Sequence, residues 1–182
     1  MSRAYKFTNP EGLYFISFAT VGWIDVFTRR EYKDILVDSL IYCQKEKGLE
    51  LYSWCIMTNH VHLIAKAKEG FLLQDSMRDF KKFTSKKLLK AIEENIQESR
   101  KEWMLSIFKS AGEYNSNNKN YQFWRQDNKP IEIFSNIVID QKLDYIHNNP
   151  VQGGVVEKPE DYLYSSAKNY AGQKGLVHVE LL

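Results

Sequence analysis

A run of β-forming residues at 51–66, broken only at Thr58-Asn59, constrains the fold of this chain more than any other feature. Such a run predicts two short strands joined at a tight corner. Side chains alternate faces along a strand, so His60 and His62 share one face of the second strand. Two imidazoles on a rigid strand can form half of a metal site, although packing or hydrogen bonding explains many such pairs.

Hydrophobic periodicity along the rest of the chain predicts a regular succession of strands and helices. The predicted elements are a strand at 13–23, a helix at 28–47, the two strands of 51–66, a helix at 72–95, a fourth strand region within 123–134 and a helix at 135–148. The spacing of Thr28 and Glu31 predicts a capping box, and Pro150 predicts that the last helix ends near Asn148. The order β-α-β-β-α-β indicates the α+β class, with a mainly antiparallel sheet and helices packed on it.

Composition and the remaining segments set limits on the class of protein. Residues 97–120 form a polar insertion whose segment 115–120 predicts a surface loop, and we otherwise expect one domain over residues 1–182. The net charge is only +2, so nucleic-acid binding would depend on a local basic patch. Cys43 and Cys55 lie in apolar surroundings, which favours reduced thiols. Without an apolar stretch that could span a bilayer, a cytoplasmic protein with no membrane partner is expected.

A second group of polar side chains lies on the last predicted helix. Tyr145 and Asn149 are four residues apart, so they lie on one face of that helix. A tyrosine beside a divalent metal can act as a nucleophile, because the metal stabilises charge that develops on a phosphate oxygen. The carbonyl oxygen of Asn149 suits a hard cation such as Mg²⁺ or Mn²⁺. Packing of this helix against His60 and His62 would therefore create a phosphotransfer centre.

Four segments carry a resemblance to a known family. Trp54–Ile64 resembles the HUH segment (His, hydrophobic residue, His) of the IS200-like single-tyrosine transposases. Lys142–Val151 is similar to the tyrosine segment of their REP-associated tyrosine transposase branch, and Asp161–Ala167 resembles the Tyr-x-x-Ser-Ser tail of that branch. Phe123–Gln126 matches a segment between the two centres. The segments occur in the same order as in the family, and the resemblance covers about residues 10–172.

The resemblance implies a fold, an activity and a role for particular residues. It implies a ferredoxin-like or RRM-like sandwich with a C-terminal tyrosine-bearing helix, acting in metal-dependent cleavage and joining of single-stranded DNA, often at a hairpin. Tyr145 would form a 5′-phosphotyrosine, while His60, His62 and Asn149 would bind Mg²⁺ or Mn²⁺. Asn149 could instead cap the helix. His147 matches no ligand of the family, and both a monomer and a homodimer are compatible with the sequence.

Basic residues would have to supply the contact with DNA. All of the predicted residues except Arg125 form a positive row on the predicted helix at 72–95, where a phosphate backbone would be attracted. The alternative is an ordinary solvated helix face. The predicted DNA-binding residues are Arg78, Lys81, Lys82, Lys86, Lys90 and Arg125. Trp124 could stack on a base but is equally compatible with the core, and we expect Ser165 and Ser166 to cap a terminal helix.

Three hypotheses of function follow from the sequence. The first is a transposase that cleaves and joins single-stranded DNA through Tyr145. The second is a non-catalytic module that binds single-stranded or hairpin nucleic acid on an RRM-like fold. The third is a metal-dependent hydrolase in which Tyr145 only hydrogen-bonds the substrate. Replacing Tyr145 by phenylalanine separates the three hypotheses.

Overall fold

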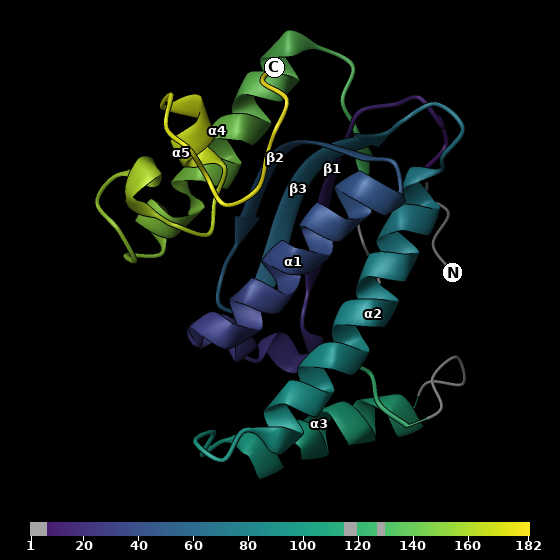
Figure 1. Ribbon diagram of the computed structural model, residues 1–182, viewed down its shortest axis with the longest axis vertical. Helices are drawn as coiled ribbons and strands as arrows, with labels where there is room; N and C mark the ends of the chain where they lie inside the picture. Colours follow the sequence, from purple (N-terminus) through teal and green to yellow (C-terminus); the bar gives the residue numbers. More distant parts are fainter. Residues whose placement is uncertain (1–6, 115–119, 127–129) are drawn as a thin grey trace.

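A computed structural model describes residues 7–114, 120–126 and 130–182 of the chain. Its centre is a four-stranded antiparallel sheet with the strand order β2-β3-β1-β4 (Figure 1). The strands are β1 (Tyr14–Ala19), β2 (Leu49–Ile56), β3 (His60–Ala67) and β4 (Ile131–Glu132). The helices are α1 (Arg30–Glu46), α2 (Leu73–Glu94), α3 (Lys101–Glu113), α4 (Asn136–Gln152) and α5 (Ala167–Tyr170). The predicted α+β class is confirmed.

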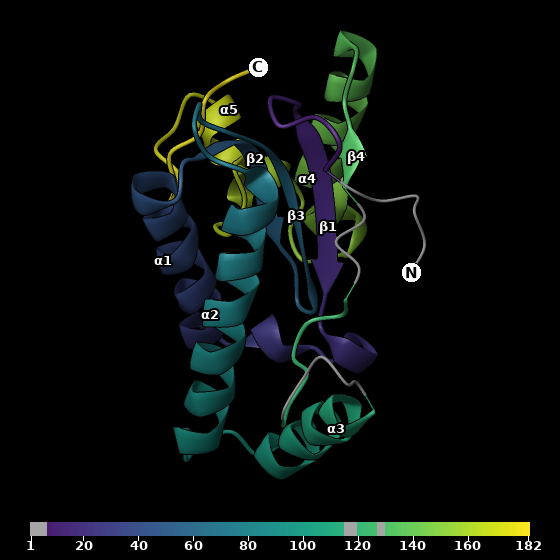
Figure 2. The same ribbon diagram turned by 90° about the vertical axis from the view of Figure 1, so that its right-hand side faces the viewer.

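The helices cover the two faces of the sheet unequally. Helices α1 and α2 pack side by side on one face, whereas α4 packs against β2 and β3 on the other (Figure 2). Helix α5 and the C-terminal segment lie beside α4 at the β2 edge (Figure 1). Within the described ranges, none of the helices combines the length and apolar character that a membrane span requires. The face under α4 is the one that carries the polar site.

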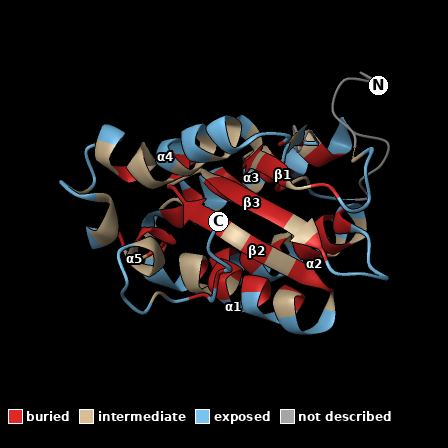
Figure 3. Cartoon of the chain, turned by 90° about the horizontal axis from the view of Figure 1, so that it is seen from above, coloured by how far each residue is buried: buried red, intermediate tan, exposed pale blue. Residues whose placement is uncertain are grey.

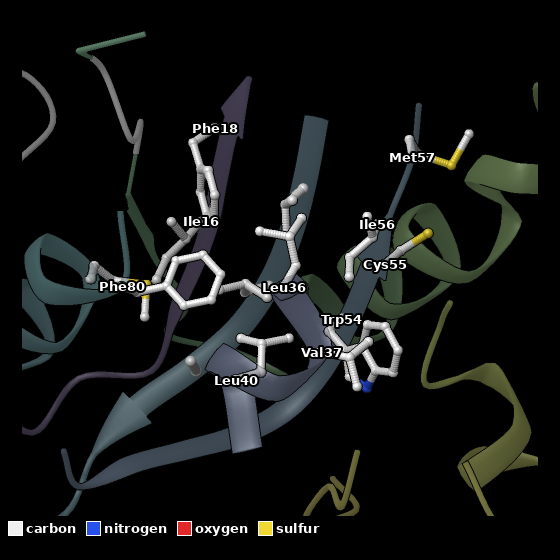
Figure 4. Close-up of a cluster of buried hydrophobic side chains, with 14 of the residues drawn as sticks. Ile16, Phe18, Leu36, Val37, Leu40, Trp54, Cys55, Ile56, Met57 and Phe80 are labelled. Atoms are coloured by element: carbon white, nitrogen blue, oxygen red, sulfur yellow. The ribbon is translucent and has the colours of Figure 1, made fainter. Parts of the chain in front are cut away.

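The core fills the space between the sheet and helices α1 and α2. Leu36 and Leu40 of α1 point toward Ile16 of β1, and Phe80 of α2 packs edge-on against Phe18 (Figure 4). Buried residues dominate β1 and β3, while exposed residues lie on the outer sides of α1 and α4 (Figure 3). Burying a large apolar side chain contributes about 1.5–3 kcal/mol, so this layer holds α1 and α2 against the sheet.

Two predictions near the N-terminus differ from the structure. Strand β1 ends at Ala19 instead of residue 23, because Gly22 adopts a φ of 64° and turns the chain away from the sheet. Thr28 does not cap helix α1, whose N-cap position is Arg29. The Thr28 hydroxyl instead accepts a hydrogen bond from Arg100, 3.1 Å away. The predicted capping box is therefore wrong, although α1 occupies the expected segment.

The polar insertion at 97–120 contains helix α3, which the sequence analysis did not assign. Met104 and Phe108, four residues apart on α3, are fully buried and attach the helix to the core. Most of the loop predicted at 115–120 lies outside the described residues. The fourth strand region at 123–134 is reduced to β4 and an isolated bridge between Trp124 and Thr20. Trp124 is buried, as its core interpretation predicts.

Helix α4 continues past the point where Pro150 was predicted to end it. The helix runs to Gln152, with Pro150 buried in its last turn. Carbonyl groups around the proline keep partners, since Asn149 accepts from the Gly153 N–H at 2.9 Å and Pro150 from the Val155 N–H at 2.9 Å. Asn149 therefore lies inside the helix, and the C-cap position belongs to Gly153.

Candidate metal and tyrosine centre

His60 and His62 lie on the face of β3 that α4 covers, as the strand alternation predicts. In the antiparallel register His62 is opposite Ser17 and His60 is opposite Ala19, so both side chains stand on the same side of the sheet. Their ring centroids are 4.7 Å apart. Because β3 is an inner strand, bonded to β2 and β1, the spacing between the two imidazoles is fixed by the sheet.

His62 is buried without a hydrogen-bond partner. Its side chain stacks on the ring of Phe15 at a centroid distance of 5.5 Å, and neither ring nitrogen is paired within the described residues. Burial, together with the electrostatic influence of His60 and Lys142, lowers the pKa of His62 to about 3. The imidazole is therefore neutral at pH 7, with a nitrogen lone pair available. Unpaired buried nitrogens carry a desolvation cost that a metal ion would relieve.

His60 is oriented by its neighbour in the corner between β2 and β3. Its Nδ1 lies 2.7 Å from Oδ1 of Asn59. An amide oxygen only accepts, so Nδ1 carries the proton and Nε2 keeps its lone pair. Burial lowers the pKa of His60, and a hydrogen bond with the Asn149 side chain opposes that effect. The structure thus brings Asn149 of α4 to His60, where its amide oxygen can join the two imidazoles around a cation.

The chemistry of this donor set fits a divalent cation with open coordination positions. Within the described residues, no third His, Cys, Asp or Glu joins the two histidines in a metal-binding group. The remaining ligands would be the Asn149 amide, water and an oxygen of the substrate. Two imidazoles and oxygen donors suit Mn²⁺ and, with more oxygen ligands, Mg²⁺.

Tyr145 stands against the histidine pair from the same chain. Its ring centroid lies 5.1 Å from that of His62 and 6.0 Å from that of Phe15. The side chain is 42% exposed, so an incoming strand can reach the phenol. Lys142, one turn earlier on α4, places its ammonium group 4.7 Å from the Phe15 ring and 5.9 Å from the Tyr145 ring. Lys142 was not predicted as a site residue, although its spacing of three from Tyr145 places both on one helix face.

A hydrogen-bonded group anchors α4 to the edge strand β2. His147 Nε2 lies 2.9 Å from Oγ of Ser166 and 3.2 Å from Oγ of Ser53. The Ser166 hydroxyl also accepts from the Trp54 backbone N–H at 3.0 Å. Ser166 occupies the N-cap position of α5, but its side chain bonds β2 and does not cap the helix, contrary to the predicted capping role. The neighbouring Ser165 does accept from the N–H of Ala167, at 3.1 Å.

The predicted DNA-binding residues fall into two groups. Arg78, Lys82, Lys86 and Lys90 are exposed on α2, on the other side of the sheet from the histidines and Tyr145 (Figure 2). Two of these residues form ion pairs, Arg78 with Asp75 and Asp79, and Lys90 with Glu94.

Lys81 and Arg125 lie nearer the site. The Lys81 ammonium donates to the Arg125 carbonyl at 2.8 Å. The Arg125 guanidinium lies over Trp23, 5.2 Å from the indole centroid, and the Trp23 ring is 6.1 Å from that of His60. Trp23 was not predicted as a site residue, because its position at the end of an apolar run indicated a strand.

Comparisons with known proteins identify a family and a fold for this chain. A family model described as IS200-like transposase matches residues 24–121. A structure of a REP-associated tyrosine transposase bound to a REP hairpin superposes with a TM-score of 0.67 and 18% identity, covering 99% of this chain and 92% of that one. A protein from Deinococcus radiodurans assigned as a transposase has a TM-score of 0.45 and 21% identity, covering 81% of this chain and 95% of that one. The search of curated proteins found no match.

The family model, together with the fold, identifies the chain as a transposase. The family model spans more than half of the chain, and the chain belongs to the IS200-like transposase family. The family predicted from the sequence is thereby confirmed, and with it the assignment of the chain as an enzyme that acts on DNA.

Proposed function

We propose that the chain is a metal-dependent endonuclease and strand transferase for single-stranded DNA, with Tyr145 as its nucleophile. The observation that carries the proposal is the contact between Tyr145 and His62 within one chain, at a centroid distance of 5.1 Å. This arrangement brings the Tyr145 ring to a pair of imidazoles, of which His62 is buried and neutral at pH 7. It also supports a site assembled in cis, which a monomer would contain in full.

The reaction exchanges one phosphodiester for another. The Tyr145 oxygen attacks the scissile phosphorus and loses its proton, while the bond from phosphorus to the 3′-oxygen breaks and that oxygen gains a proton. The products are a 5′-phosphotyrosine and a free 3′-hydroxyl, which can reverse the step and join DNA without an external energy source. Lys142 stands beside Tyr145 and would hold the negatively charged phosphate within reach of the phenol.

His60, His62 and Asn149 are the residues proposed to hold the cation. A divalent ion bound there would supply Lewis-acid stabilisation of charge on the phosphate oxygens. Asn59 keeps His60 in the tautomer that leaves Nε2 free. The packing of Phe15 against His62 keeps bulk water from one side of the site.

Hairpin-forming DNA is the proposed substrate. The superposed REP-associated transposase is bound to a REP hairpin, and its fold covers almost all of this chain. Lys81 and Arg125 would contact the strand near the site. Arg78, Lys82, Lys86 and Lys90 face another direction and would contact a more distant part of the DNA, with strong dependence on salt.

Replacing Tyr145 by phenylalanine tests the proposal. Wild-type protein, incubated with Mn²⁺ or Mg²⁺ and a set of labelled DNA hairpins with single-stranded flanks, is expected to form a covalent adduct that survives denaturing electrophoresis. Tyr145→Phe should bind the same hairpin but form no adduct. Tyr42→Phe is the matched control, because Tyr42 is 56% exposed on α1 on the opposite side of the sheet, and it should react like wild type.

Each other outcome identifies a different function. Cleavage that survives Tyr145→Phe would indicate the metal-dependent hydrolase. Binding without cleavage or adduct formation on every hairpin, with either metal, would indicate the non-catalytic binding module.

A further inference from the structure

Trp23 is held in a backbone conformation that costs energy. It is the only non-glycine residue with positive φ in the described part of the chain, at 55°. A bulky side chain rarely adopts this left-handed conformation, which costs about 1–2 kcal/mol. Burial does not compensate for it, because the indole is 54% exposed. Strain that persists in this way is found most often at functional sites.

The side chain that holds the Trp23 backbone also orients His60. The Asn59 side chain donates from Nδ2 to the Trp23 carbonyl at 3.1 Å, while its Oδ1 accepts from His60 at 2.7 Å. The Trp23 N–H donates to the Thr20 carbonyl at 3.2 Å, and the Thr20 N–H donates to the Asn59 carbonyl at 2.9 Å. Trp23 and His60 are therefore connected through a single side chain, which holds the Trp23 backbone beside the site.

The surroundings of the indole are those of a base-stacking surface. Its ring stands edge-on to that of His60, with an interplanar angle of 74° and a centroid distance of 6.1 Å. The Arg125 guanidinium carbon lies 5.2 Å from the indole centroid. An exposed aromatic ring with an arginine over it is a combination that binds single-stranded nucleic acid, because the ring stacks on a base and the cation attracts the backbone.

We propose that Trp23 and Arg125 form a stacking site for one unpaired nucleobase of single-stranded DNA, next to the scissile phosphate. The inference rests on the proposed function, which places that phosphate at His60. Stacking fixes the strand beside the site and thereby selects which phosphate reaches Tyr145. Since every base offers a π-face, the site distinguishes unpaired from paired bases but does not distinguish one base from another. It would therefore bind the single-stranded flank more tightly than duplex DNA.

The test measures binding separately from cleavage. All proteins carry Tyr145→Phe, which prevents reaction, and the probe is a fluorescent DNA hairpin with a single-stranded flank. Trp23→Ala should weaken binding by about 10- to 100-fold, as expected for the loss of one stacked base. Trp23→Phe keeps a ring and should recover most of the affinity. Circular dichroism and thermal unfolding of each variant establish that it folds.

Phe83→Ala is the matched control. Phe83 is 56% exposed and has the Lys87 ammonium 5.7 Å from its ring, so it repeats the aromatic and cationic pair. It lies on α2 in a groove shared with Tyr42 of α1, away from the histidines, and should bind hairpin DNA like the parent protein.

A series of abasic substitutions along the flank locates the base. In the parent protein, one abasic position should lower the affinity for the hairpin as much as Trp23→Ala does. In the Trp23→Ala protein, the same abasic position should lower the affinity no further, because the stacking contact is already lost. A loss below twofold for Trp23→Ala, or abasic penalties that are the same in both proteins, would overturn the stacking site. Such a result would not affect the proposal that Tyr145 forms the adduct. Failure of the wild-type protein to form an adduct, in contrast, would refute the proposed function.

Discussion

Replacing Ser166 by alanine should destabilise the protein, because its hydroxyl connects three elements at a buried point. Ser166 is fully buried and accepts from the Trp54 N–H while contacting His147. The variant leaves the Trp54 N–H without its partner, which costs about 1–3 kcal/mol, and removes a hydrogen bond with a net value of about 1 kcal/mol. His147 keeps Ser53, 3.2 Å away. The expected loss in the free energy of unfolding is therefore about 2–4 kcal/mol.

Urea unfolding measures this loss directly. With a slope of about 2 kcal/mol per molar urea, the midpoint should fall by about 1–2 M with no change in slope. Ser165→Ala is the matched control, since Ser165 is equally buried and accepts a single N–H, from Ala167. Its loss should be smaller by at least about 1 kcal/mol. Equal losses, or less than about 0.5 kcal/mol for Ser166→Ala, would refute the idea that this hydroxyl anchors α4.

Three further predictions concern acid stability, a turn and the assembly of the site. Hydrogen bonds from Arg100 and Arg29 lower the pKa of Glu98 from 4.5 to about 2. The stability that Glu98 contributes is therefore present above about pH 4.5 and lost as the pH falls toward 2. In Glu98→Gln the urea midpoint should depend less on pH between 4.5 and 2 than it does in the wild type. Gly48→Ala should lower the free energy of unfolding in urea more than Gly70→Ala does. Both glycines have positive φ, +63° and +82°, but a Cβ at Gly48 would meet the ring of Phe71, whereas a Cβ at Gly70 would lie in open space. Equal losses would contradict the predicted clash. Mixing Tyr145→Phe with His62→Ala should restore no adduct, because both groups belong to one chain, and restored adduct would indicate exchange of tyrosine helices between protomers.

The half of the site on β3 could be predicted because it depends on local geometry. Alternation along a strand is enough to place His60 and His62 on one face, and the antiparallel register confirms it. The spacing of Tyr145 and Asn149 likewise follows from helix geometry. Their approach to the histidines was a prediction about packing, and the 5.1 Å separation of Tyr145 and His62 agrees with it. Their roles as nucleophile and ligands stay predictions.

Features that depend on tertiary contacts could not be read from the sequence. Trp23 lies at the end of an apolar run, and the turn at Gly22 that separates it from β1 is not evident from that run. His147 has no local partner, since Ser53 and Ser166 come from distant segments. Helix α3 is amphipathic, with Met104, Phe108 and Gly112 buried, but the polar run at 115–120 dominated the interpretation of its segment. The roles of Trp23 and His147, in contrast, became visible only when segments far apart in sequence were brought together.

The corner at Asn59 shows that folding and the geometry of the site depend on the same atoms. Its backbone carbonyl accepts from Thr20 and so fixes the chain after β1. Its side chain holds the Trp23 carbonyl and the His60 imidazole at the same time. The corner that joins β2 and β3 thereby sets the tautomer of one proposed ligand and anchors the backbone of the proposed stacking residue. Replacing Asn59 would therefore disturb the hairpin and the proposed site together.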